Sequence, residues 1–202
     1  MAFHDRRITP RRRQAWWAIL VARSTCDETT RNAFVSLQAG DRAPNLNRTF
    51  LDSDGNEIDL AAALSSGPLL LGIYKSSCGA SKAMMPILNR FVDRYGVFGL
   101  QVIGIAQDSA NVTRSFIRRS GGLDYPVLIE GDDYPLSIEF DIFATPTVYV
   151  IRQDGTIAYT TMGFLRVQLE EFSRAVAEVL GVAYQPIIQE EIDEEIPLFV
   201  PG

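Results

Sequence analysis

The residue whose type and position most clearly suggest chemistry is Cys78. The apolar run at residues 69–74 precedes it and predicts a buried strand, and from Gly79 onward apolar residues recur at helical spacing. Cys78 is therefore expected where a strand ends and a helix begins. The first turn of a helix has unpaired N–H groups and a partial positive charge, which stabilise an anion. A cysteine there is expected to have a lowered pKa, and its thiolate is the reactive form.

Two lysines flank this cysteine. Lys75 and Lys82 carry positive charge close to it in the sequence and are expected to lower its pKa further. The alternative interpretation is that Cys78 is an ordinary small core residue, because free cysteines are commonly buried and inert. The strand–cysteine–helix context favours a functional thiol.

Few other residues offer nucleophilic or metal-binding chemistry. Cys26 and Cys78 are the two cysteines of the chain, and His4 is its one histidine. These three residues form no zinc site of recognised spacing, and a cysteine–histidine pair would require His4, close to the N-terminus. We therefore expect no metal and no cofactor. Two cysteines do not reveal the redox compartment.

The composition suits one domain with appendages. The chain has 202 residues and a net charge of −6, which argues against a general nucleic-acid binder. The charge is uneven, since residues 1–31 hold seven arginines and three acidic residues, whereas residues 182–202 hold five acidic residues and no lysine or arginine. We expect a basic arm at 1–39, a domain at 40–181 and an acidic extended tail at 182–202. Both ends are expected to be solvated, with mutual association or partner binding as alternatives.

The N-terminal arm resembles an export signal in part. Arginines at 11–13 precede the apolar run at 15–22, but this run is too short to span a bilayer and no small-x-small cleavage site follows. We expect a short helix in this arm, no transmembrane segment and a cytoplasmic location. A divergent export signal is the alternative.

The domain alternates between strand and helix patterns. Strands are expected at 69–74, 100–106 and 126–130, with helices beginning near residues 79, 109 and 134, which indicates a parallel sheet with crossover helices. A hairpin at 48–58 and a short helix at 60–64, capped by Asp59, are expected before them. Strands at 147–151 and 156–160 around an Asp-Gly turn predict an antiparallel hairpin, followed by a helix at 165–180. Asp108 or Ser109 is expected to cap the helix near 109.

This order of elements, with a cysteine at the first strand-to-helix junction, resembles the thioredoxin fold, a three-layer α/β/α sandwich around a mixed sheet. More closely it resembles the redoxin branch, which includes TlpA-like thiol–disulfide oxidoreductases and AhpC/TSA peroxiredoxins. Residues 77–82, Ser-Cys-Gly-Ala-Ser-Lys, stand where that family has Trp-Cys-Gly-Pro-Cys-Lys. Pro86 matches a helix-kinking proline, and residues 144–147, Ala-Thr-Pro-Thr, match the cis-proline loop. The resemblance covers about residues 40–181.

The resemblance implies the site residues. Cys78 and Ser81 take the catalytic positions, and Pro146, if cis, would place the Thr145 backbone beside Cys78, ready to pair with an extended substrate. The substrate-binding residues implied by the match are Ser77, Gly79, Ala80, Thr145 and Pro146.

The sequence also departs from the family. Ser81 replaces the second cysteine, which in a dithiol enzyme resolves the mixed disulfide. Gly72 stands where thioredoxins keep a buried acid, and Ser77 replaces the tryptophan. The Pro-x-x-x-Thr-x-x-Cys loop of peroxiredoxins is absent as well, because no threonine stands three residues before Cys78 and no proline lies in the loop.

Three functions follow as hypotheses. The first is a monothiol redox protein, in which Cys78 forms mixed disulfides with protein or small-molecule thiols and an external thiol releases them. The second is a one-cysteine peroxidase that oxidises Cys78 to a sulfenate. The third is a binding scaffold with little or no turnover. Cys26 as a remote resolving thiol is a further alternative to an incidental exposed cysteine, and the oligomeric state cannot be read from the sequence.

Overall fold

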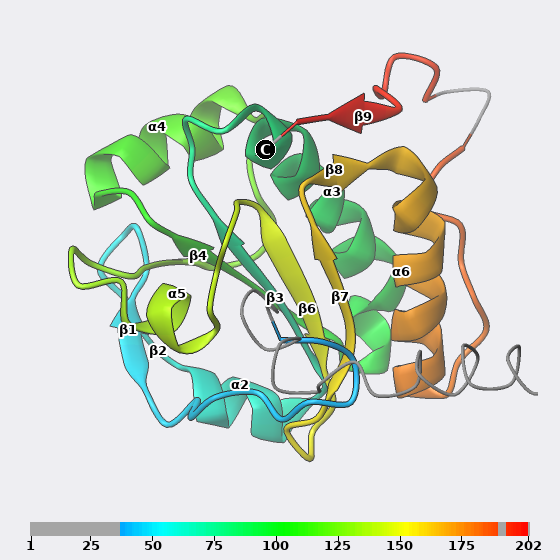
Figure 1. Cartoon of the computed structure of the whole chain (residues 1–202), viewed down its shortest axis with the longest axis horizontal. Helices are drawn as coiled ribbons and strands as arrows, with labels where there is room; N and C mark the ends of the chain where they lie inside the picture. The colour runs from blue at the N-terminus through cyan, green and yellow to red at the C-terminus, as the bar shows by residue number, and fades with distance from the viewer. Residues whose placement is uncertain (1–36, 190–192, 202) are drawn as a thin grey trace, which may run out of the picture. The chain divides into compact units, whose positions relative to one another are not determined.

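The computed structural model describes residues 37–189 and 193–201 (Figure 1). The predicted basic arm and its helix, His4, Cys26 and the possible export signal lie outside these residues. Among the described residues, no helix combines the length and the apolar character needed to cross a bilayer.

A five-stranded mixed sheet forms the centre of the domain. Its strand order is β5-β4-β3-β6-β7, with β3, β4 and β5 parallel and with β6 and β7 antiparallel to their neighbours. The strands are β3 (Leu69–Tyr74), β4 (Gln101–Ala106), β5 (Val127–Ile129), β6 (Thr147–Ile151) and β7 (Ile157–Met162). All six residues of β3 are buried, because the strand is central and helices cover both faces of the sheet.

The two faces of the sheet bury separate apolar clusters. Leu70 and Tyr74 of β3 pack with residues of α3 (Gly79–Tyr95), α4 (Ala110–Arg119) and α6 (Arg166–Leu180). Leu69, Leu71 and Ile73 face the other way and pack with α2 (Leu60–Ser66), the Leu136 side chain of α5 (Pro135–Glu139) and residues of the hairpin. The alternation along β3 thus produces a three-layer α/β/α arrangement, as the sequence predicts. The 3₁₀ turn η3 (Gly96–Phe98) follows α3.

The elements outside the sheet follow the prediction. The predicted hairpin is β1 (Thr49–Leu51) with β2 (Glu57–Asp59), and the Asp59 carboxylate accepts hydrogen bonds from the first turn of α2. Of Asp108 and Ser109, the two residues expected as candidates to cap α4, the structure selects Ser109. Ser109 holds the N-cap position without a side-chain bond, whereas Asp108 accepts a hydrogen bond from the Ser76 backbone N–H at 2.7 Å. The Asp108 carboxylate thus bonds to the loop before Cys78 instead of to the start of its own helix.

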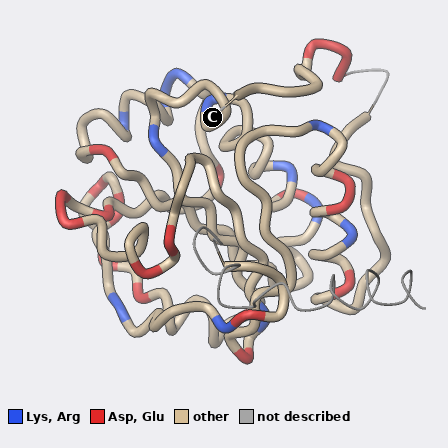
Figure 2. Tube along the Cα trace, viewed as in Figure 1, with Lys and Arg blue, Asp and Glu red and all other residues tan. Residues whose placement is uncertain are grey.

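The C-terminal residues differ most from expectation. Ile187 and Ile188 are buried against α3 and α6, and β9 (Phe199–Val200) pairs with β8 (Phe164–Leu165) in an antiparallel ladder. We call residues 193–201 the C-terminal segment. Figure 1 shows it beside the start of α6, and Figure 2 shows acidic residues on the loop that leads to β9. The tail is therefore docked on the domain at Ile187, Ile188, Asp193 and β9, whereas most of residues 193–201 remain exposed.

Charged groups hold the C-terminal segment to the domain. The Arg90 guanidinium of α3 donates to both carboxylate oxygens of Asp193, at 2.6 and 2.7 Å, and to the Ile187 carbonyl at 2.8 Å. The hydrogen bonds and charge of Arg90 lower the pKa of Asp193 to about 2, against the opposing effect of burial. The Glu170 carboxylate of α6 accepts from the backbone N–H groups of Ile187 and Ile188. Because these contacts depend on single charged side chains, the periodicity of the sequence does not reveal them.

Candidate functional site

Cys78 lies at the N-cap position of α3, directly after the central strand and a short loop. Its backbone is extended. The Cys78 carbonyl accepts a hydrogen bond from the Lys82 backbone N–H at 3.2 Å, and the Cys78 N–H donates to the Lys75 carbonyl at 3.1 Å. The bond from Ser76 to Asp108 ties this loop to the end of β4. The thiol is partly exposed. The loop is thus held in place while the sulfur remains accessible.

The proline loop before β6 lies against the cysteine. The Thr145–Pro146 peptide bond is cis, which confirms the prediction, and the Cys78 thiol donates to the Thr145 carbonyl at 3.0 Å. The Pro146 carbonyl accepts the N–H of Gly163 at 2.8 Å. The end of β7 therefore meets the same loop that contacts the thiol.

The environment lowers the pKa of the Cys78 thiol. Partial burial raises this pKa, but the Ser81 backbone N–H and hydroxyl, the Thr145 side chain and the Ala80 N–H together outweigh burial. These groups stabilise the thiolate by hydrogen bonding. The expected lowering at a helix N-terminus is present, and it comes from the first turn of α3 and from the proline loop.

Ser81 is the neighbour best placed to act on the sulfur. Its side chain is fully buried, and its hydroxyl makes no hydrogen bond of ordinary geometry with any residue that the structure describes. A buried hydroxyl normally has a partner. The Ser81 hydroxyl is therefore available to the Cys78 thiolate, one helical turn away.

The other predicted site residues divide into two groups. Thr145, Ala80 and Ser81 surround the thiol and affect its pKa. Ser77 and Gly79 are exposed beside the thiol, and so are Lys75 and Lys82. Neither lysine is among the groups that lower the pKa of Cys78 above, so their contribution remains a prediction.

Two features of the site are not evident in the sequence. The first is Asp108, which positions the loop before Cys78. The second is Val200 of β9, because a Cβ atom added to Gly79 would lie 3.4 Å from its Cγ1. Asp108 is at least recognisable as an acidic residue at a strand end, whereas no local pattern signals Val200.

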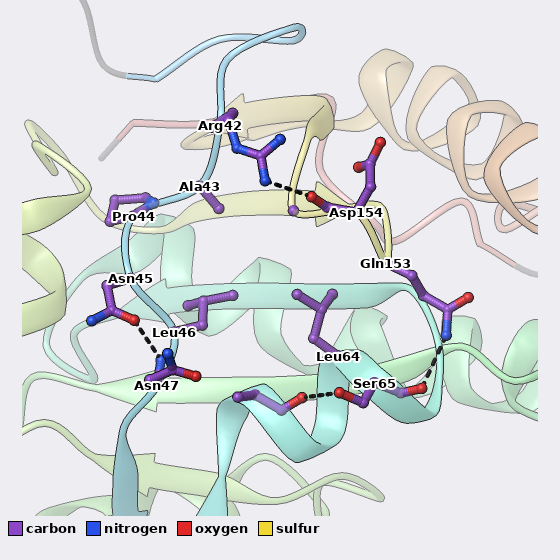
Figure 3. Close-up of a pocket in the computed structure, with 12 residues that line it drawn as sticks. Arg42, Ala43, Pro44, Asn45, Leu46, Asn47, Leu64, Ser65, Gln153 and Asp154 are labelled. Atoms are coloured by element: carbon purple, nitrogen blue, oxygen red, sulfur yellow. Dashed lines mark hydrogen bonds between the residues drawn. The ribbon is translucent and has the colours of Figure 1, made fainter.

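A polar cavity of about 270 Å³ lies at the opposite end of the sheet (Figure 3). The Arg42 guanidinium donates to the Asp154 carbonyl, the Gln153 amide donates to the Ser65 carbonyl, and the Ser65 hydroxyl donates to the Ala61 carbonyl. Its one lining hydroxyl is thus engaged with the backbone, and the lining contains no thiol. Among residues 37–189 and 193–201, no group of three or more histidine, cysteine or acidic side chains is placed to hold a metal.

We expect a Ser81→Ala variant to raise the pKa of Cys78, because a hydroxyl that stabilises the thiolate is lost. The pH dependence of the alkylation rate with iodoacetamide, in a Cys26→Ser background, measures this shift. Ser77→Ala removes an exposed hydroxyl and serves as the matched control. Equal alkylation profiles in the two variants would contradict a role for Ser81.

Comparison with known proteins agrees with this geometry. Residues 39–160 match the AhpC/TSA family. A putative thiol:disulfide interchange protein DsbE from Chlorobium tepidum superposes with a TM-score of 0.64 at 20% identity, covering 72% of this chain and all of that one. The peroxidoxin BcpB from Mycobacterium tuberculosis superposes with a TM-score of 0.60 at 17% identity, over 73% of this chain and 99% of that one.

A putative protein disulfide isomerase from Bacteroides thetaiotaomicron is also similar, with a TM-score of 0.63, 18% identity and coverage of 73% and 95% of the two chains. No curated protein matches the chain in sequence. These structures share the thioredoxin-like fold with this chain, and their identity is too low to show more. The family match spans more than half of the sequence, and the chain therefore belongs to the AhpC/TSA family.

Proposed function

We propose that this protein is a monothiol redoxin, which exchanges disulfides through Cys78 and depends on an external thiol to complete each cycle. The observation that supports it most directly is the environment of the sulfur. Cys78 is partly exposed, its pKa is lowered, and the serine one turn along the helix cannot act as a second thiol.

The reaction proceeds in two exchanges. The Cys78 thiolate attacks one sulfur of a disulfide R–S–S–R′, which forms Cys78–S–S–R and releases R′–S⁻. A second thiolate, R″–S⁻, then attacks the R sulfur, which yields R–S–S–R″ and restores the Cys78 thiolate. Electrons balance within each exchange, so no metal or other cofactor takes part.

Ser81 and Thr145 have distinct roles in this proposal. The Ser81 hydroxyl and N–H stabilise the thiolate, both before attack and when it leaves in the second exchange. The Thr145 carbonyl accepts a hydrogen bond from the thiol at 3.0 Å, and this acceptor becomes free when the thiol loses its proton. An N–H group of an extended substrate can then occupy it.

Peroxide reduction is the second candidate, because the family match includes proteins of the AhpC/TSA group and a peroxidoxin shares the fold. In that reaction the Cys78 thiolate attacks a peroxide ROOH, which gives Cys78–SOH and, after protonation, ROH. The absence of threonine and proline before Cys78 in the loop favours disulfide exchange over this candidate.

Intact-mass measurement of three proteins tests the proposal. Wild type and Cys26→Ser are expected to form one mixed disulfide with oxidised glutathione within minutes at neutral pH, and a reducing thiol should release it. Cys78→Ser should form none at residue 78, because the nucleophile is absent. A parallel incubation with hydrogen peroxide separates the two candidates.

Two results would contradict disulfide exchange. One is a Cys26→Ser protein that reacts no faster than free glutathione. The other is a fast conversion to the sulfenate by peroxide together with slow reaction with oxidised glutathione, which would select the peroxidase. A Cys26–Cys78 disulfide in wild type would show as the loss of the mass of two hydrogen atoms, with oxidised glutathione as the electron acceptor, and Cys26→Ser would abolish it.

A further inference from the structure

The C-terminal segment occupies a strand edge next to the reactive cysteine. In β8, Phe164 pairs with Val200 and Leu165 with Phe199, and the Arg166 N–H donates to the Leu198 carbonyl at 3.0 Å. An edge strand with free N–H and C=O groups can pair with any extended chain. Here part of the protein's own chain takes that place.

This edge belongs to the surroundings of Cys78. Gly163, directly before β8, donates to the Pro146 carbonyl at 2.8 Å, and the neighbouring Thr145 carbonyl accepts from the thiol at 3.0 Å. On the other side of the segment, Val200 lies against Gly79, the first residue of α3. Both the proline loop and the helix that carries Cys78 therefore border the C-terminal segment.

The segment is held in the manner of a bound peptide. The Phe199 side chain is 59% exposed and Leu198 is 76% exposed, so these large side chains contribute little burial. Backbone pairing and the partly buried Val200 hold this end, while the buried Asp193 carboxylate, bonded to Arg90, anchors the other. Main-chain hydrogen bonds with one side-chain contact are typical of β-strand addition.

We propose that β9 occupies the position that an extended polypeptide substrate would take beside Cys78, so that the docked segment selects small disulfides over polypeptide ones. Val200 is the specificity-determining residue and Asp193 is the anchor that keeps it in place. This inference rests on the proposed exchange at Cys78. A small disulfide needs only the partly exposed sulfur, whereas a polypeptide also needs the backbone groups of β8 and the space beside Gly79.

Two probes with the same leaving group test the idea. One is the small disulfide dithiobis(nitrobenzoate), and the other is an unstructured polypeptide whose single cysteine carries thionitrobenzoate. Both release the same coloured thiolate, so the ratio of their rates reports access to the polypeptide. All variants carry Cys26→Ser, and circular dichroism checks that each is folded.

Asp193→Asn and Val200→Gly are expected to raise the ratio of polypeptide to small-probe rates by about tenfold. The first weakens the buried ion pair with Arg90, and the second removes the partly buried side chain that packs beside Gly79. Glu195→Gln makes the same charge change two residues further on at an exposed site and is expected to leave the ratio unchanged. The two test variants weaken the segment at different ends, so the result does not depend on one substitution.

A ratio that stays equal or falls in both test variants, with a normal small-probe rate, would overturn this inference and leave the proposed exchange intact. Slow reaction of both probes in every variant would contradict the exchange at Cys78 and this inference with it.

Discussion

A Ser81→Cys variant is expected to form a disulfide between residues 78 and 81 and to lose the stable mixed disulfide with glutathione. The Ser81 N–H and hydroxyl both act on the Cys78 sulfur, so a thiol at that position lies within reach of it. A resolving thiol in the same molecule has an effective concentration of millimolar or more. The glutathione adduct should therefore decrease by at least about tenfold.

Intact mass after oxidised glutathione measures both products, again in a Cys26→Ser background. Ala83→Cys adds a thiol two residues further along α3, on a different face of the helix, and is expected to leave the adduct on Cys78. Persistence of the adduct in Ser81→Cys would mean that the buried side chain at 81 cannot reach a mixed disulfide. The replacement of a second cysteine by Ser81 would then not explain why Cys78 depends on an external thiol.

A Gly72→Asp variant is expected to lose about 3–5 kcal/mol of stability at neutral pH, because it buries a carboxylate without a partner. A Cβ atom at Gly72 would lie 3.2 Å from Leu88 Cδ1 and 3.3 Å from Met85 Cε. These two side chains of α3 fill the space next to the central strand where thioredoxins keep an acid. The acid is therefore not merely missing from the sequence, since its place is occupied.

The pH dependence of this variant has a definite sign. Burial raises the native pKa of the introduced carboxyl above its unfolded value of about 4. The loss of stability should be smallest below about pH 4 and should grow as the pH rises through the native pKa. Urea unfolding at acidic and neutral pH measures it, and Gly72→Ala isolates the steric part, about 1–3 kcal/mol. A pH-independent loss, equal to that of Gly72→Ala, would contradict a buried charge.

The sequence predicts the fold and the place of Cys78 at a helix N-terminus because both depend on local signals. Each signal is recognisable from a few neighbouring residues. The signals are the buried run of β3, the helical spacing after Gly79 and the Thr-Pro pair before β6. Their assembly follows from the right-handed crossover rule for parallel strands. The cis proline beside Cys78 is the clearest confirmed detail.

The remaining features of the site depend on contacts between distant residues. β9 has two residues and pairs by its backbone, so it has no period to detect. Asp108 can bond to the start of its own helix or to Ser76, and only the tertiary structure decides between them. The groups that lower the pKa of Cys78 are Ser81, Ala80 and Thr145, and Thr145 is distant in the sequence. A contribution from Lys75 and Lys82 stays a prediction.

The central position of β3 has a consequence for how the molecule opens. Strands flank β3 on both sides and all six of its residues are buried, so its amides should exchange with solvent only on global unfolding. The two-residue ladder of β8 and β9 is far smaller and belongs among the regions that open locally at low free energy. Cys78 thus follows a strand that we expect to open only with the whole domain, whereas we expect β9 to open more readily. If β9 occupies the substrate position as proposed, we expect its local opening to expose that position repeatedly while the domain stays folded.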